Sequence, residues 1–153
     1  MTEDARFADG AERPLRLRAL DGEDLGVISA LVQDAVFAQA DMNWVRKSGR
    51  FAILLNRFRW ERGEIGPERV RAMLVIEDVV KVQTRGLPPA GEGVVLSLLS
   101  LSWTATDEVS GRITLTLAGD GEIALDVEVL EVVLQDVSRP YAALSGRAPD
   151  HPD

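Results

Sequence analysis

The chain of 153 residues can bury a core within one domain, and 46% hydrophobic with 27% charged residues is an ordinary globular composition. Its net charge of −8 argues against general binding to nucleic acid or to an anionic membrane, because both are themselves negative. The absence of cysteine excludes disulfides, thiolate metal sites and cysteine nucleophiles. There is no bilayer-length apolar run and no signal-peptide core, so we expect a cytoplasmic protein with no membrane contact.

The N-terminal region predicts one strand and one helix. Residues 1–14 are polar and acidic, and we interpret them as a loose leader. Residues 15–19 alternate leucine or alanine with arginine, which is typical of a half-buried strand. Asp21 then fits a helix N-cap, and the helix should end near Gln33. Its apolar stripe, which we expect to pack on a sheet, consists of Leu25, Ile28, Leu31 and Val32.

The stretch from Met42 to Trp60 predicts a β-hairpin around which the other elements are arranged. Its turn, residues 46–50, contains Gly49, which takes a positive φ at no steric cost. The second strand places Phe51, Ile53 and Leu55 on one face, and its opposite face also carries apolar groups. We therefore expect this strand to be central in its sheet, with residues 35–38 as a weaker strand candidate before it.

The remaining chain predicts further strands with short connections. The expected strands cover residues 70–76, 79–85, 94–105, 112–117 and 122–129, followed by a final apolar stretch through Leu134. Glu77 and Asp78 form a tight reversal, and residues 86–93, with two prolines and three glycines, form a loop. The apolar alternation slips near Leu98 and again near Val129, which predicts a β-bulge or a sharp bend.

One early helix followed by about seven strands predicts a single α+β domain over residues 15–141. We expect a mostly antiparallel bent sheet or an open barrel, with the short N-terminal helix packed on it. Residues 142–153 are expected to be a mobile tail. A many-stranded sheet with one covering helix leaves an edge exposed, so we also expect a homodimer.

No motif in the chain defines a catalytic or metal site. The sole histidine, His151, lies near the chain end, which argues against Ser-His-Asp catalysis and histidine-based zinc sites. Neither the dinucleotide-binding motif GxGxxG nor the phosphate-binding motif GxxxxGK(S/T) is present. The carboxylate groups have simple explanations: a helix cap at Asp21, a turn at Glu77 and Asp78, and a solvated strand face at Asp126 and Glu128, opposite Thr114 and Thr116. We assign no catalytic residue, no cofactor and no metal, and the pattern favours a non-catalytic protein while leaving the question of an enzyme open.

Basic residues concentrate in the hairpin. Residues 41–62 hold six basic and two acidic side chains, a net charge of +4, whereas the rest of the chain carries −12. Arginine forks beside aromatic rings bind phosphate, carboxylate or a stacked base. The candidate ligand- or partner-binding residues are Trp44, Arg46, Lys47, Arg50, Arg57, Arg59 and Trp60. In the alternative interpretation, these arginines pair with the chain's own acidic residues and the two tryptophans belong to the core.

Three functional hypotheses follow. In the first, the protein is a non-catalytic cytoplasmic module that docks an acidic protein or a phosphorylated small ligand through the hairpin of residues 44–62. In the second, it is a small carboxylate-dependent enzyme, with or without a divalent metal. In the third, it is a structural subunit that dimerises through a strand edge. The first requires exposed arginines without acidic neighbours.

Four segments in this order, LRLRALDGEDLGVISALVQDAV, MNWVRKSGRFAILLNRFRWE, ERVRAMLVIEDVVKVQTRGL and DVEVLEVVLQDVSRPY, resemble a bacterial family of unknown function, DUF2948. The resemblance runs from about Leu15 to Tyr141. It implies a single-domain protein, but it implies no activity and transfers no catalytic or binding residue.

Overall fold

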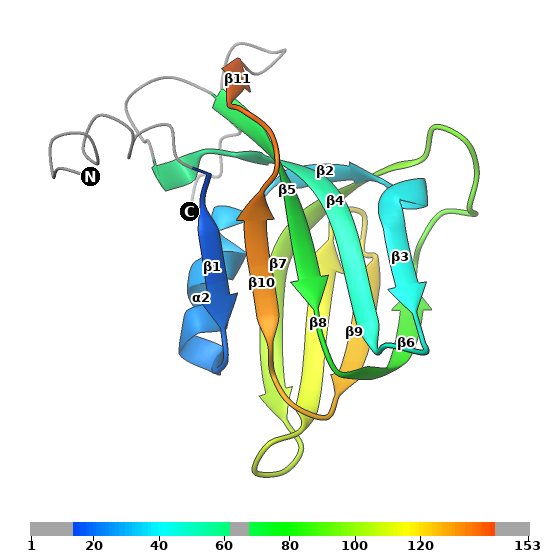
Figure 1. Ribbon diagram of the computed structural model, residues 1–153. Helices are drawn as coiled ribbons and strands as arrows, with labels where there is room; N and C mark the ends of the chain where they lie inside the picture. Colours follow the sequence, from blue (N-terminus) through cyan, green and yellow to red (C-terminus); the bar gives the residue numbers. More distant parts are fainter. Residues whose placement is uncertain (1–13, 62–67, 143–153) are drawn as a thin grey trace, which may run out of the picture.

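The computed structural model of the chain describes residues 14–61 and 68–142, and shows one bent antiparallel sheet with a single α-helix in this part (Figure 1). The helix is α2 (Gly22–Leu31), and a short 3-10 turn, η1, covers Gln39–Asp41. The strands are β1 (Arg16–Ala19), β2 (Ala35–Ala38), β3 (Met42–Val45), β4 (Arg50–Phe58), β5 (Glu68–Ile76), β6 (Val79–Arg85), β7 (Val95–Ala105), β8 (Gly111–Leu117), β9 (Glu122–Val127), β10 (Val132–Asp136) and β11 (Tyr141–Ala142).

The described residues form eleven strands rather than about seven, while the expected antiparallel character and single helix are confirmed. The difference comes mainly from short strands. β2 and β3 have four residues each and β11 has two. The sequence predicts residues 35–38 and the first arm of the hairpin as strands, and they form β2 and β3, so the figure of about seven undercounts the expected segments, whereas β11 is not predicted.

The main path of the sheet runs β1-β10-β5-β4-β2-β7-β8-β9-β6, with β3 also paired to β4 and β11 to β5. β4 is central, as predicted, because β5 pairs along one side and β3 and β2 share the other. The bend places β10, β5 and β4 in front of β7, β8 and β9 (Figure 1). Between these layers lies one core, to which β4 contributes Phe51, Ile53 and Leu55 and β8 contributes Ile113, Leu115 and Leu117.

Helix α2 begins where the sequence predicts, at Asp21, whose Oδ1 accepts a hydrogen bond of 2.8 Å from the backbone N–H of Asp24. Its buried face consists of Leu25 and Ile28, with Val32 buried just beyond its end. The helix packs against β7 and β1, two strands that do not pair with each other, and so covers the core between them. It ends at Leu31, slightly before the predicted Gln33.

Both predicted slips in the alternation occur. The β7–β8 register shifts between Leu98 and Ser100, and β9 ends at Val127, so that residues 128–131 form a bend before β10. A third irregularity, in the β6–β9 ladder between Val79 and Lys81, was not predicted. A bulge adds one residue to one strand only, which changes the face that every later side chain of that strand occupies.

The chain ends are only partly described. The expected leader and tail, residues 1–14 and 142–153, lie almost entirely outside the described residues, with Pro14 and Ala142 at the borders. Tyr141 and Ala142 form β11 and pair with Arg69 and Glu68 of β5. Residues 62–67, between β4 and β5, also lie outside the described part. Within that part, no helix combines the length and apolar character needed to cross a membrane.

Candidate functional site

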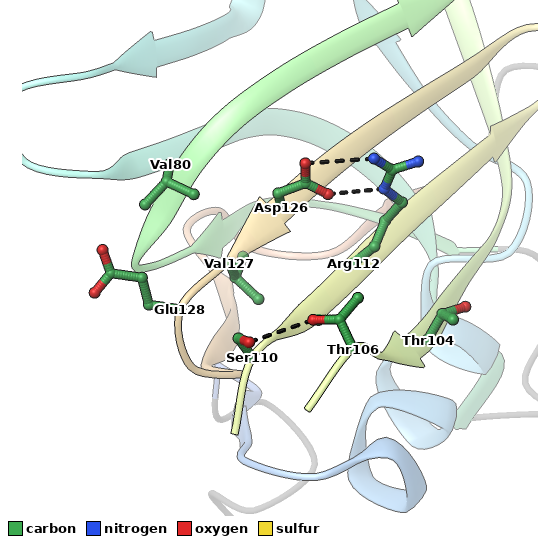
Figure 2. A pocket seen from close by; sticks show the side chains of 9 residues that line it. Val80, Thr104, Thr106, Ser110, Arg112, Asp126, Val127 and Glu128 are labelled. Atoms are coloured by element: carbon green, nitrogen blue, oxygen red, sulfur yellow. Dashed lines mark hydrogen bonds and ion pairs between the residues drawn. The ribbon is translucent and has the colours of Figure 1, made fainter. Parts of the chain in front are cut away.

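A shallow groove of about 540 Å³ lies on the outer face of β6, β9, β8 and β7 (Figure 2). The strand register explains its polar lining, because Asp126, Arg112 and Thr104 are consecutive cross-strand partners in one row. Outward positions on half-solvated strands take polar side chains. Contrary to the sequence interpretation, Asp126 therefore faces Arg112, whereas Thr114 and Thr116 face Ala124 and Glu122.

Arg112 and Asp126 neutralise each other inside this groove. The Nε and Nη2 atoms of Arg112 lie 2.7 and 3.3 Å from the two carboxylate oxygens of Asp126. The hydrogen bond to Asp126 raises the pKa of Arg112, and the same bond lowers the pKa of Asp126. Asp126 is therefore a weaker proton acceptor than an ordinary aspartate, and both of its carboxylate oxygens are already bonded to Arg112.

The hydroxyl groups of the groove come from Thr104 on β7 and from Thr106 and Ser110 in the loop between β7 and β8. Ser110 Oγ lies 3.3 Å from Thr106 Oγ1 and donates a 2.5 Å hydrogen bond to Asp107. This bond, with backbone N–H donors of Ser110 and Val109, lowers the pKa of Asp107 to about 2. A carboxylate of such low pKa accepts a proton poorly, and the Ser110–Asp107 hydrogen bond closes the loop between β7 and β8. Among the described residues, no three His, Asp or Glu side chains cluster closely enough to hold a metal ion.

The basic hairpin divides into an exposed turn and a buried strand end. In the turn, Arg46 and Lys47 are exposed and form no ion pair with any described residue. Arg50 follows them, but its guanidinium binds both carboxylate oxygens of Glu77 at 2.8–3.2 Å. This hydrogen bond to Glu77 raises the pKa of Arg50. Two of the predicted binding cations are therefore available to a partner, and the third already has an acidic neighbour.

Arg57 is completely buried, with no exposed side-chain surface. Its guanidinium makes two 3.0 Å hydrogen bonds to Asp136 and bonds of 2.8 and 2.7 Å to Glu61, and it also donates to the carbonyl of Phe58. Burial alone lowers the pKa of Arg57, but these carboxylates outweigh it and raise the pKa overall. The arrangement places a satisfied ion cluster inside the protein, out of reach of a docked ligand.

The remaining predicted residues also lie close to the protein body. The side chain of Arg59 is 9% exposed and binds Glu68 at 3.0 Å. Trp60 is partly buried and its indole N–H donates to the carbonyl of Gln33 at 2.9 Å, while Trp44 packs partly buried against the core. The alternative interpretation therefore describes Arg50, Arg57, Arg59 and both tryptophans better than an open basic face does.

The alternation of β4 contained the signal for Arg57. Phe51, Ile53 and Leu55 point inward, and the next residue on that face is Arg57. An arginine that continues a buried face indicates a buried ion pair, because a guanidinium without carboxylate partners is too costly to bury. The partner Asp136 could not be recognised in the same way, because it lies 79 residues further along the chain.

The described residues form a β-rich fold with one core. Their ion pairs between arginines and carboxylates mostly link different strands and loops of this same chain. Over residues 15–151 the chain matches the protein family of unknown function DUF2948, and it belongs to this family. No curated protein and no solved structure matches the chain.

Proposed function

We propose that the protein is a non-catalytic binding module that docks an acidic segment of a partner protein through the turn between β3 and β4. The observation that carries this proposal is the state of Arg46 and Lys47: both are exposed and neither forms an ion pair within the described part of the chain. The protein as a whole has a net charge of −8, so two adjacent cations without internal partners make the turn a locally positive site on a negative protein.

The turn is held firmly enough to present these cations. Gly49 has φ of +71°, and its carbonyl accepts a 2.8 Å hydrogen bond from the backbone N–H of Val79. The two-oxygen contact between Arg50 and Glu77 joins the same turn to the end of β5. Positioning in advance reduces the entropy lost on binding, so even two exposed cations gain affinity from it. Arg57 takes no direct part in this proposal, because its side chain is buried.

The experiment compares Arg46→Gln/Lys47→Gln with a control, Arg16→Gln/Arg139→Gln. The control removes two exposed arginines that also lack ion pairs within the described residues, one on β1 and one before β11. Binding of a fluorescent, capped oligoglutamate peptide is measured at low salt. We expect the turn variant to bind about tenfold more weakly, equivalent to about 0.7 kcal/mol for each charge, and the control to bind like the unmodified protein.

Two results would contradict the proposal: no binding of oligoglutamate to the unmodified protein, or equal weakening in both variants. Equal weakening would mean that the peptide senses only the net charge. A parallel titration with phosphoserine amide tests the phosphorylated-ligand alternative. Saturable binding of that compound without binding of oligoglutamate would replace the acidic segment by a small phosphorylated ligand.

A further inference from the structure

The bent sheet has an open seam between β3 and β6. β6 ends the main path and pairs only with β9, and β3, which lies off that path, pairs only with β4. Between the described residues of these two strands and their turns, one backbone hydrogen bond crosses the seam, from Val79 N–H to Gly49 C=O. Beyond it, β6 is exposed at Val80, Lys81, Gln83, Thr84 and Arg85. An edge strand left uncovered in this way is a template for another strand.

The register shows which backbone groups of β6 face the seam. Three residues of β6 pair with buried residues of β9: Val79 with Val127, Val82 with Leu125, and Thr84 with Ile123. These three β6 residues therefore belong to the inner face of the strand, and the bulge between Val79 and Lys81 accounts for their uneven spacing. Residues of one phase direct N–H and C=O to the same side of a strand. Since Val79 N–H points across the seam, Val82 and Thr84 also present their backbone groups there. Lys81, Gln83 and Arg85 therefore bond to β9.

The side chains beside the seam differ between its two faces. On the inner side, Met42, Trp44 and Val82 are partly buried and packed against the core. On the outer side, Lys81 is exposed. The turn that carries Arg46 and Lys47, both exposed, is joined to the start of β6 through Gly49. A strand added to the edge of β6 would therefore meet apolar groups inward and cations outward. Side chains alternate between faces, so this surface matches alternating apolar and acidic residues.

We infer that β6 binds an extended segment of a partner protein as an additional strand, and that this segment alternates apolar with acidic residues. The inference rests on the proposed function and specifies how the acidic segment docks. A second copy of the chain fits the edge less well. Pairing two β6 strands would bring Lys81 of both copies onto one sheet, where like charges on neighbouring strands repel, although Arg85 is already paired with Glu122.

The test uses a capped seven-residue peptide in which glutamate alternates with valine, and two variants at one position. Thr84→Pro removes the seam-facing N–H while leaving the bonds of Gln83 and Arg85 to β9, and proline is tolerated on the open side of an edge strand. Thr84→Ala is the matched control, because it removes the same side chain and keeps the N–H. We expect Thr84→Pro to weaken peptide binding at least tenfold and Thr84→Ala less than twofold.

A second measurement needs no variant. In the free protein, the amides of Val82 and Thr84 should exchange with deuterium much faster than those of Lys81, Gln83 and Arg85. Saturating peptide should slow the first two at least tenfold and leave the others nearly unchanged. Uniform exchange along free β6, or no slowing with peptide, would overturn the inference. A dimer in light scattering that Thr84→Pro converts to monomer would also overturn it, because a second copy would then occupy the seam.

The two proposals fail in different ways. If oligoglutamate binding depends on Arg46 and Lys47 but the alternating peptide binds Thr84→Pro and Thr84→Ala equally, docking at the turn stands and strand addition is rejected. If neither peptide binds the unmodified protein, both proposals are rejected.

Discussion

Arg57 joins strands that are not neighbours. β5 lies between β4 and β10, so the guanidinium of Arg57 reaches Asp136 across the inner side of β5. Asp136 in turn accepts a 3.2 Å hydrogen bond from the backbone N–H of Leu15, which precedes β1. Three strands therefore meet at one buried ion pair. Such a pair adds little compared with apolar packing, but the loss of one partner leaves a buried charge uncompensated.

Replacement of Arg57 by glutamine should therefore lower the free energy of unfolding by about 3–5 kcal/mol. The control is Arg85→Gln, which breaks an ion pair with Glu122 in which the arginine side chain is 76% exposed. Exposed pairs contribute about 0–1 kcal/mol, so this variant should melt nearly like the unmodified protein. Denaturant unfolding of both variants checks the prediction, and losses of similar size would show that the Arg57 cluster is not a structural element.

The pKa of Glu61 adds a pH dependence to the same cluster. Burial alone raises it, but the hydrogen bonds from Arg57 lower the pKa overall from an ordinary value of 4.5. A carboxylate whose pKa is lower in the folded state stabilises the protein above its ordinary pKa and loses this contribution as the pH falls through the folded value. The stability difference between the unmodified protein and Glu61→Gln should therefore be constant near neutral pH and shrink below about pH 4.5. Unfolding curves across this range test it, and a difference that grows in acid would contradict the sign.

At the level of the elements, the packing of β7 against β8 depends on Gly111. A Cβ atom at this position would lie 2.5 Å from the carbonyl oxygen of Thr104 and 2.6 Å from the Trp103 ring. Both neighbours are fixed by the ladder, which pairs Trp103 with Ile113 and Thr104 with Arg112. A side chain at residue 111 would thus force the two strands apart.

Two glycine-to-alanine substitutions should consequently have opposite effects. Gly111→Ala should lower the free energy of unfolding by about 1–3 kcal/mol through overpacking. Gly26 lies in α2, and no neighbouring atom lies within 4 Å of an added Cβ. Gly26→Ala should therefore raise the free energy of unfolding by about 0.5–1 kcal/mol, because alanine has the higher helix propensity. Thermal melts of the pair decide the matter. A stabilising Gly111→Ala would mean that β7 and β8 have more space than the structure shows.

At the level of the whole molecule, a net charge of −8 repels an acidic partner, while Arg46 and Lys47 attract it locally. Salt screens both effects, since the Debye length falls from about 10 Å at 0.1 M to about 3 Å at 1 M. The affinity ratio between the unmodified protein and Arg46→Gln/Lys47→Gln should therefore approach one as salt rises. The variant Arg16→Gln/Arg139→Gln has the same net charge as the turn variant. A difference in affinity between the two variants therefore measures the local attraction by Arg46 and Lys47, separate from the effect of net charge. A ratio independent of salt would indicate a non-electrostatic role for the turn.

The local features of the chain could be predicted from its sequence. As the sequence predicts, Asp21 caps α2, the chain reverses at Glu77 and Asp78 before β6, and the register of β7 shifts near Leu98. At the reversal Asp78 has a φ of 57°. Each of these depends on neighbouring residues only. An N-cap needs an acceptor just before the helix, a turn needs a residue that tolerates a positive φ, and a bulge appears as a slip in alternation.

Only the tertiary structure decided which basic residues remain exposed. Sequence gathers the charges of the hairpin but does not state their partners, and Arg57 meets Asp136 from 79 residues away. The open seam is also a tertiary property. The sequence of β6 does not show that it is an edge strand, and only the strand order shows that it pairs with β9 alone. The physical reason is that alternation fixes the face of each side chain, whereas the neighbour of a strand depends on how the entire sheet bends around its core.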